Sequence, residues 1–290
     1  MAYEQIVYSA TERIATITLN RPEKRNAWTA VMAEEVRDAM LKAAGDRTVR
    51  VIVVTGAGRG FCAGADMAEL RGAAGQSTSG LKAVEDPEEK VSHLMGTKTE
   101  EQLDPDNQWG ARDDFRKRYS YLPAIPKPII AAINGPTAGL GLIVALFCDL
   151  RFASDRASFS TAFSRRGLIA EHGVSWLLPR IVGLSNAMDL LFSARMVNAD
   201  EAFRLGLVNR VFPESDFVMG VRAYANELAL AVSPRSLRVI KKQIWEGQFQ
   251  TLAEAAKVAD SELLDSMSSA DFREGVAHFL EKRPPEFTGE

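Results

Sequence analysis

The alternation of apolar and polar positions in the first part of the chain predicts strands separated by a helix. Residues 14–19 alternate apolar and small polar side chains, which is typical of a strand with one buried face. Residues 29–44 place apolar side chains at helical spacing, with Thr29 as a suitable cap and Gly45 after the last turn. Residues 49–55 form a nearly continuous Val/Ile run, which suits a strand covered on both faces. This order favours an α/β protein.

The same patterns continue to residue 212, after which only helical patterns remain. Further strands are predicted over residues 129–133, 150–153, 157–161 and 207–212. Helices are predicted over residues 139–147, three times within 173–206, and over 217–232, 234–247, from 251 onward and 272–283. We therefore expect a mixed core over residues 1–212 and a helical C-terminal region over residues 213–290.

Residues 71–112 interrupt this regularity. They are mostly polar and contain Gly, Ser and two Asp-Pro pairs without a hydrophobic period. We expect a variable surface insertion in this stretch, followed by a short helix over residues 113–122.

Composition and charge exclude several classes of function. The chain has 290 residues, 46% of them hydrophobic and 25% charged, which is the balance of an ordinary globular protein. The net charge of -3 provides no overall positive field for nucleic acid or an anionic membrane. No apolar run is long enough to span a membrane, and the first residues lack the pattern of a signal or transit peptide. A cytoplasmic location is expected.

Cysteine and histidine are too sparse for a structural metal site. The two cysteines, Cys62 and Cys148, form no C-x-x-C pair, and none of the three histidines has zinc-ligand spacing. We predict reduced thiols and no bound metal.

Two glycine-containing turns, residues 63–66 and 135–141, precede predicted helices. The first N–H groups of a helix lack partners inside the helix and are available to negative charge. Two such turns side by side would form an oxyanion hole, although glycines in tight packing would give the same sequence pattern. Nucleotide-binding fingerprints and the G-x-S-x-G motif are absent from the sequence.

Several short motifs follow one another in order along the chain. They are LNRP at 19–22, NA at 26–27, FCAGADM at 61–67, KPIIAAING at 127–135 and CD at 148–149. Together they resemble the crotonase superfamily of enoyl-CoA hydratases and isomerases, over nearly the whole chain except residues 71–112. The resemblance implies an α/β fold, the crotonase (ClpP-like) spiral of strand-strand-helix turns with a helical C-terminal trimerisation region. It also implies homotrimers or hexamers and an acyl-CoA thioester substrate, with coenzyme A as part of the substrate and no separate cofactor.

The resemblance also assigns residues to the site. The backbone N–H groups of Ala65 and Leu140 would hold the thioester oxygen, with Leu140 standing where glycine is common. Residues expected to contact the substrate or its CoA moiety are Lys24, Arg25, Ala27, Ala63, Asp66, Met67, Gly139 and Phe163. Lys24 and Arg25 have an equally simple explanation as solvated loop charges, and Asp66 is expected to cap the helix that follows it.

The residues expected to do the chemistry depart from the hydratase pattern. Hydratases of this superfamily use two glutamates, whereas the matching positions here are Ile143 and Phe163. Residues 167–173 instead resemble the stretch in which single-acid enoyl-CoA isomerases carry their base, and that residue is Glu171 here. One carboxylate suffices to move a proton from C2 to C4 while a double bond shifts from the 3- to the 2-position.

Several alternatives remain open at this point. Glu171 would also be explained as a solvated carboxylate near a helix start, or as the lone base of an enoyl-CoA hydratase. Thioester or C–C hydrolysis, or a catalytically idle acyl-CoA-binding subunit, would share the same scaffold. His172 and the Arg165-Arg166 pair are interpreted as exposed bystanders. Ile143, Phe163 and Trp176 are expected to line an apolar acyl pocket or to belong to the core.

Overall fold

The computed structural model describes residues 3–75, 90 and 111–290. Its main sheet has six strands in the order β1-β2-β3-β4-β6-β9, in which β1 pairs antiparallel with β2 and the other neighbours pair in parallel. These strands are β1 (Ile6–Thr11), β2 (Ile14–Leu19), β3 (Val51–Gly56), β4 (Ile129–Ile133), β6 (Leu150–Ser154) and β9 (Arg210–Phe212). A second, three-stranded sheet contains β5 (Thr137–Ala138), β7 (Ser158–Ser160) and β8 (Val197–Asn198).

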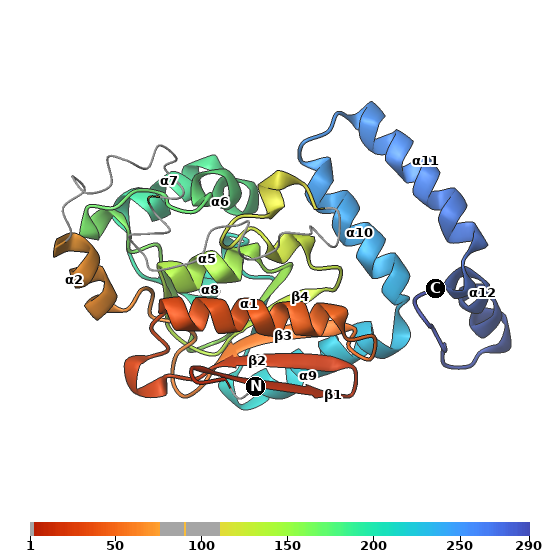
Figure 1. Ribbon diagram of the computed structural model, residues 1–290, viewed down its shortest axis with the longest axis horizontal. Coiled ribbons are helices and arrows are strands. Elements are labelled where there is room, and N and C mark those ends of the chain that lie inside the picture. Colours follow the sequence, from red (N-terminus) through yellow and green to blue (C-terminus); the bar gives the residue numbers. More distant parts are fainter. Residues whose placement is uncertain (1–2, 76–89, 91–110) are drawn as a thin grey trace.

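Helices surround the sheets and make up the C-terminal part of the chain (Figure 1). They are α1 (Ala30–Gly45), α2 (Met67–Gly75), α5 (Leu140–Phe147), α6 (Val174–Val182), α7 (Leu184–Ser193), α8 (Ala199–Arg204), α9 (Glu214–Ala231), α10 (Pro234–Gly247), α11 (Leu252–Ser268) and α12 (Ala270–Glu281). Single 3₁₀ turns occur at Pro22–Lys24, Asp113–Phe115, Leu122–Ala124 and Ser164–Arg166.

Both faces of the main sheet are covered by helices, which explains the nearly continuous Val/Ile run in β3. Ile52 and Val54 point into the core shared with α1 and α5, while Val51 and Val53 pack against α9. Figure 1 shows α1 and α9 on opposite sides of the strands. The expectation of a strand buried on both faces is therefore confirmed, and α9 serves as one of the two covering layers.

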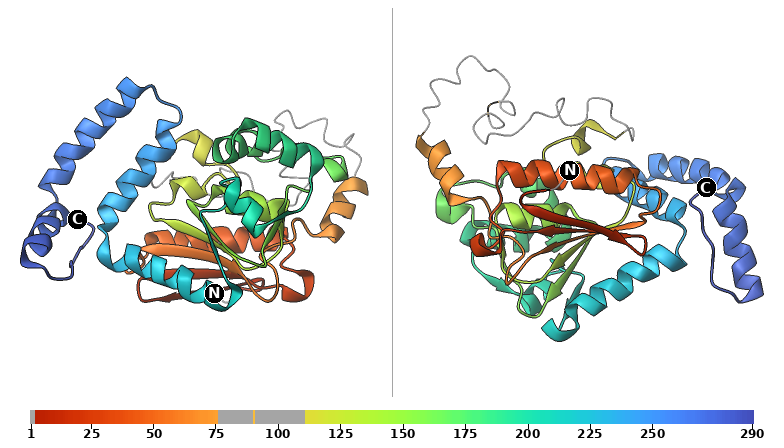
Figure 2. Two further views of the ribbon diagram at one scale, coloured as in Figure 1. Left: turned by 180° about the vertical axis from the view of Figure 1, so that it is seen from behind. Right: turned by 60° about the horizontal axis from the view of Figure 1, so that its bottom comes forward.

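The C-terminal helices leave the sheet after α10. A buried ion pair ties α10 to the core, because Lys241 Nζ lies 2.8 Å from Asp149 Oδ2. Trp245 Nε1 donates to the other oxygen of the same carboxylate at 2.9 Å. Beyond this junction α11 and α12 lie away from the sheet in every view (Figures 1 and 2). Because α9 packs on the sheet, the domain boundary at residue 212 stays a prediction.

Two segments differ from the sequence expectations or lie beyond them. The helix predicted over residues 113–122 is wrong: the chain forms separate 3₁₀ turns at Asp113–Phe115 and Leu122–Ala124. A segment of this length is marginal as a helix, and Pro123 carries no N–H with which to extend it. Of the insertion predicted over 71–112, residues 76–89 and 91–110 lie outside the described residues. Within the described ranges, no helix combines the length and apolar character needed to cross a lipid bilayer.

Candidate active site

The two glycine turns of the sequence touch each other in the structure. Ala138 N donates to Cys62 O at 3.0 Å, which joins the loop before α5 to the loop before α2. Gly64 has φ +98°, and a Cβ there would lie 3.1 Å from Ala138 O; a Cβ on Gly139, with φ +49°, would lie 3.7 Å from Gly64 Cα. Because neither residue has a side chain, the two backbones approach closely.

This contact places two unsatisfied backbone donors in one cavity. Trp28 N donates to Gly64 O and Asp66 N donates to Trp28 O, both at 2.8 Å, so the N–H of Ala65 between them faces away from this pairing. Leu140 is the first residue of α5. Among the described residues, neither the Ala65 N–H nor the Leu140 N–H has a hydrogen-bond acceptor. The positive end of the α5 dipole adds to the attraction for an anionic oxygen.

The cavity has a volume of about 1020 Å³. Every residue that the sequence assigned to the site lines it: Lys24, Arg25, Ala27, Ala63, Ala65, Asp66, Met67, Gly139, Leu140, Phe163 and Glu171. The structure therefore brings together residues from five separate segments, while their roles stay a prediction.

Charged residues surround part of this cavity. Lys24 and Arg25, at the 3₁₀ turn after Arg21, are exposed and line the cavity. Asp66 accepts a hydrogen bond from Ala68 N at 2.9 Å and pairs with Arg21 at 3.0 Å. The pKa of Asp66 is lowered, first by the Ala68 hydrogen bond and then by the Arg21 guanidinium. The predicted role of Asp66 as a helix cap is confirmed.

Glu171 lies just before α6, on the opposite side of the chain's site segments. Its side chain is half-buried, and burial raises the pKa of the Glu171 carboxyl. His172 Nε2 is 3.9 Å from Glu171 Oε2, and the His172 ring meets the ring of Tyr119 edge-on at 4.9 Å. With only 17% of its side chain exposed, His172 is not the exposed bystander that the sequence suggested.

The apolar positions divide between cavity and core. Phe163 lines the cavity, whereas Ile143 is fully buried in α5 and belongs to the core. Among the described lining residues, carboxyl groups come only from Asp66 and Glu171. Trp176 does not line this cavity but a second one next to it. Within the described ranges, His, Cys, Asp and Glu side chains form no group of three that would hold a metal ion.

The segment that carries Phe163 is fastened to the end of α7. Thr161 Oγ1 donates to Leu190 O at 2.8 Å, and Ser164 Oγ donates to Phe192 O at 2.9 Å. Further donors are Ser160 Oγ to Ala194 O and Arg165 Nε to Ser193 O, both at 2.9 Å. Side chains of one segment thus satisfy the last carbonyls of the helix, which would otherwise lack partners.

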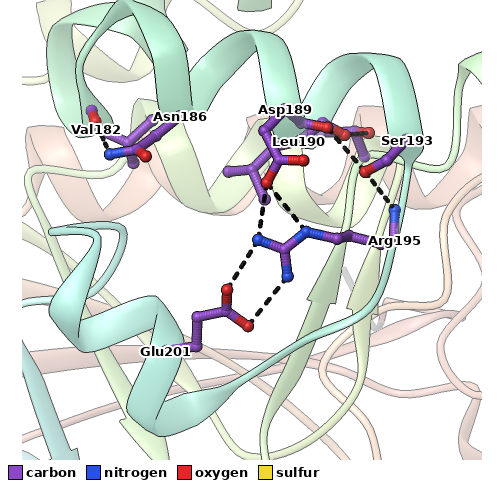
Figure 3. A network of polar contacts seen from close by, with 8 residues as sticks. Val182, Asn186, Asp189, Leu190, Ser193, Arg195 and Glu201 are labelled. Atoms are coloured by element: carbon purple, nitrogen blue, oxygen red, sulfur yellow. Dashed lines mark hydrogen bonds and ion pairs between the residues drawn. The ribbon is translucent and has the colours of Figure 1, made fainter.

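Arg195 in turn holds this end of α7 in place (Figure 3). Its guanidinium lies 2.7 Å from Asp189 Oδ2 in α7 and 2.7 Å from Glu201 Oε1 in α8. Ser193 Oγ also donates to Asp189 O at 2.7 Å. One side chain therefore links the two helices behind the cavity wall.

Comparison with known proteins identifies the family to which this site belongs. The family described as enoyl-CoA hydratase/isomerase matches residues 9–95 and 93–290. The chain belongs to the enoyl-CoA hydratase/isomerase family. A probable enoyl-CoA hydratase of Rhodobacter capsulatus is 37% identical over 100% of both chains. A 1,2-epoxyphenylacetyl-CoA isomerase of Escherichia coli is 32% identical over 99% of both chains.

Solved structures of the enoyl-CoA hydratase/isomerase family also match. A putative enoyl-CoA hydratase from Streptomyces coelicolor superposes with a TM-score of 0.83 at 30% identity, covering 100% of this chain and 96% of the other. The crotonase fold predicted from the sequence is confirmed, and the protein is an acyl-CoA enzyme of this family.

Some residues lining the family's cavity in this chain were not singled out from the sequence. Arg166, interpreted as part of a solvated pair, lines the cavity although it is exposed. Leu168 and Ile169 also line it, and 39% and 75% of their surfaces are exposed. Their apolar side chains between Gly167 and Glu171 were the available signal, because a solvated loop has no need of them.

Proposed function

We propose that the protein moves the double bond of a 3-enoyl-CoA thioester to the 2-position. The Glu171 carboxylate takes a proton from C2, and the C–H electrons move into the carbon chain and onto the thioester oxygen. The N–H groups of Ala65 and Leu140 hold the resulting dienolate. Glu171 then returns the same proton to C4, which leaves the double bond in conjugation with the thioester.

One observation carries this proposal: a single carboxylate is available for proton transfer in the cavity. Asp66 is engaged with Arg21 and with the first turn of α2, and Ile143 and Phe163 replace the two hydratase glutamates. Burial of Glu171 strengthens it as a base, because a carboxylate with a raised pKa accepts a proton more readily. Isomerisation uses one group for both transfers, so a second acid is not required.

The cavity rim also suits the CoA portion of such a substrate. We propose that Lys24 and Arg25 attract its phosphates, with Arg166 as a third cation, while Ala27, Ala63 and Met67 contact it. No further cofactor takes part in this mechanism. Exposed apolar side chains on α11 and α12, including Leu264 and Phe279, are proposed to be covered in a homotrimer or hexamer. A cytoplasmic location remains part of the proposal.

Hydration of a 2-enoyl-CoA is the second candidate. It is supported by the name of the Rhodobacter relative, a probable enoyl-CoA hydratase. In this case Glu171 alone would take a proton from water, and the same amide pair would stabilise the enolate.

Turnover of matched 3-enoyl-CoA and 2-enoyl-CoA substrates tests the two candidates. The conjugated thioester is followed by its ultraviolet absorbance, with the wild type, Glu171→Gln, and Glu227→Gln on exposed α9 as a control. Isomerisation predicts rising absorbance with the 3-enoyl substrate and a loss of about 10² to 10⁴ in kcat for Glu171→Gln only. Falling absorbance with the 2-enoyl substrate would instead establish hydration, and an unimpaired Glu171→Gln variant would refute the role of this residue.

A further inference from the structure

A second cavity lies next to the catalytic one and has an aromatic lining. Its volume is about 510 Å³, within the range of small-molecule sites. The aromatic side chains that line it are Phe115, Tyr119, Phe147, Trp176 and Phe249. Phe115, Tyr119 and Phe147 are almost fully buried, and the mechanism proposed above uses none of these residues.

The two cavities meet at His172, which lines both of them. Its ring lies between the proposed base and the aromatic cavity, 3.9 Å from Glu171 Oε2 and 4.9 Å from the Tyr119 ring centroid. A substrate whose C2 and C4 face Glu171 therefore points its remaining carbons past His172 toward the second cavity.

Helix α5 sets the distance between the thioester and this cavity. Leu140, the proposed oxyanion donor, begins the helix, and Phe147, which lines the aromatic cavity, ends it. At 1.5 Å per residue the separation along the helix axis is about 10 Å. This is the reach of a short acyl chain that ends in a ring.

The aromatic side chains present edges more than faces. Trp176 and Phe249 are stacked at 5.2 Å with an interplanar angle of 13°. Guanidinium groups cover both rings, since Arg180 lies 4.0 Å from the Trp176 ring and Arg112 lies 4.4 Å from the Phe249 ring. A stacked partner and a guanidinium together occupy the ring faces, so the ring edges are left for a guest.

Ring edges carry the positive part of the aromatic quadrupole and attract the negative face of another ring. Phe115 already meets Phe249 in this way, at 5.8 Å and 73°. An aliphatic group of equal size would gain the same apolar burial without this electrostatic match.

We propose that the substrates are acyl-CoA thioesters whose acyl group ends in an aromatic ring, and that this ring occupies the second cavity. The inference rests on the proposed function for the direction of the acyl chain. It goes further by specifying the chemical class of the group at the far end of that chain.

A pair of substrates of nearly equal size tests this proposal. We would compare 5-phenylpent-3-enoyl-CoA with 5-cyclohexylpent-3-enoyl-CoA in the wild type, in Phe249→Leu, and in Phe203→Leu, an exposed residue of α8, as the control. In the wild type and the control, kcat/KM should favour the phenyl compound by about 3- to 10-fold, the range expected for one or two aromatic pairs. Phe249→Leu should bring this ratio close to one. Equal values in the wild type, or a ratio that survives Phe249→Leu, would overturn the proposal.

Binding of unreactive analogues separates this inference from the isomerase assignment. Dissociation constants for the saturated 5-phenylpentanoyl-CoA and 5-cyclohexylpentanoyl-CoA require no chemistry at Glu171. A phenyl preference of similar size that is lost in Phe249→Leu supports the aromatic site even if no double bond moves. Equal dissociation constants contradict it even if isomerisation is observed.

Discussion

Residues 62–67 and 137–142, here called the amide wall, differ from residues 160–172, the acid wall, in how they are held. The amide wall is fixed by backbone contacts, such as the hydrogen bond from Ala138 N to Cys62 O, and by close approach at Gly64 and Gly139. The acid wall is fixed by side chains that bond to the end of α7. The position of the donors thus depends on the presence of glycine, whereas the acid wall depends on particular side chains and can change with them.

The largest effect is expected from a small change in the amide wall. A Cβ on Gly141 would lie 2.5 Å from Cys62 Cβ and 2.6 Å from Cys62 O, so Gly141→Ala must push α5 away from the neighbouring loop. Displacing the Leu140 donor should lower kcat by about 10² to 10³. Overpacking should cost about 1–3 kcal/mol in the free energy of unfolding.

The matched control is Gly45→Ala at the end of α1, where a Cβ would meet nothing within 4 Å. Steady-state rates and denaturant unfolding of both variants give the comparison. If Gly141→Ala retained the kcat of Gly45→Ala, the close contact between the two loops would not position the donors.

The second effect concerns pH and belongs to the acid wall alone. The amide donors do not titrate, and Asp66 has a lowered pKa, so loss of activity on acidification should report Glu171. Because burial raises the pKa of Glu171, the acidic limb of kcat/KM should lie above the ordinary glutamate value of about 4.3. Below that limb the rate should fall about tenfold per pH unit, since the base must be deprotonated.

Two titratable groups face Glu171 and bear on this profile. Tyr119 stays protonated throughout, since burial raises its pKa, while His172 lies 3.9 Å from the Glu171 carboxylate. The His172→Gln variant should keep an acidic limb, because the limb belongs to Glu171. A wild-type limb at or below the ordinary glutamate value would contradict the burial effect.

The smallest effect is expected at the support of the acid wall. Arg195→Met removes the pairs with Asp189 and Glu201, and partly exposed pairs of this kind contribute a few tenths to 1 kcal/mol each. We expect a loss of about 1 kcal/mol in unfolding free energy and a rise of roughly two- to fivefold in KM, with kcat little changed.

Arg222→Met provides the control, because Arg222 makes one exposed pair with Glu12 at 2.7 Å, away from both walls. It should lose a similar or smaller amount of stability and leave KM unchanged. Equal KM values in the two variants would show that the α7–α8 link does not support the cavity.

The sequence predicted the amide wall better than the acid wall. Glycines at 64 and 139 and the apolar run after them are local signals, so α5 and its donors were expected at the right place. The surroundings of His172 were not predictable, because Tyr119 and the end of α7 reach the site from distant parts of the chain. Trp176 was expected in an acyl pocket, and only the packing of Phe249 against it revealed a separate cavity.

Helices and strands followed the same rule. The strands β2, β3 and β4 and the helix α1 carry strong periodic patterns and were predicted within a few residues. The segment over 113–122 was not, because its rings are buried by contacts with distant residues such as Phe249 and Trp28. Tertiary packing, which a single sequence does not display, decided its conformation.

The junction at Asp149 has a consequence for the order in which the molecule is completed during synthesis. All described residues that line the catalytic cavity precede Gly173, whereas the aromatic cavity needs Phe249. Trp245 and Asp149, which hold this part of the chain, are separated by 96 residues. At a translation rate of about 5–20 residues per second, the carboxylate waits roughly 5–20 seconds for its indole partner to be made. The nascent chain therefore holds every segment of the reacting centre before the far end of its substrate site exists.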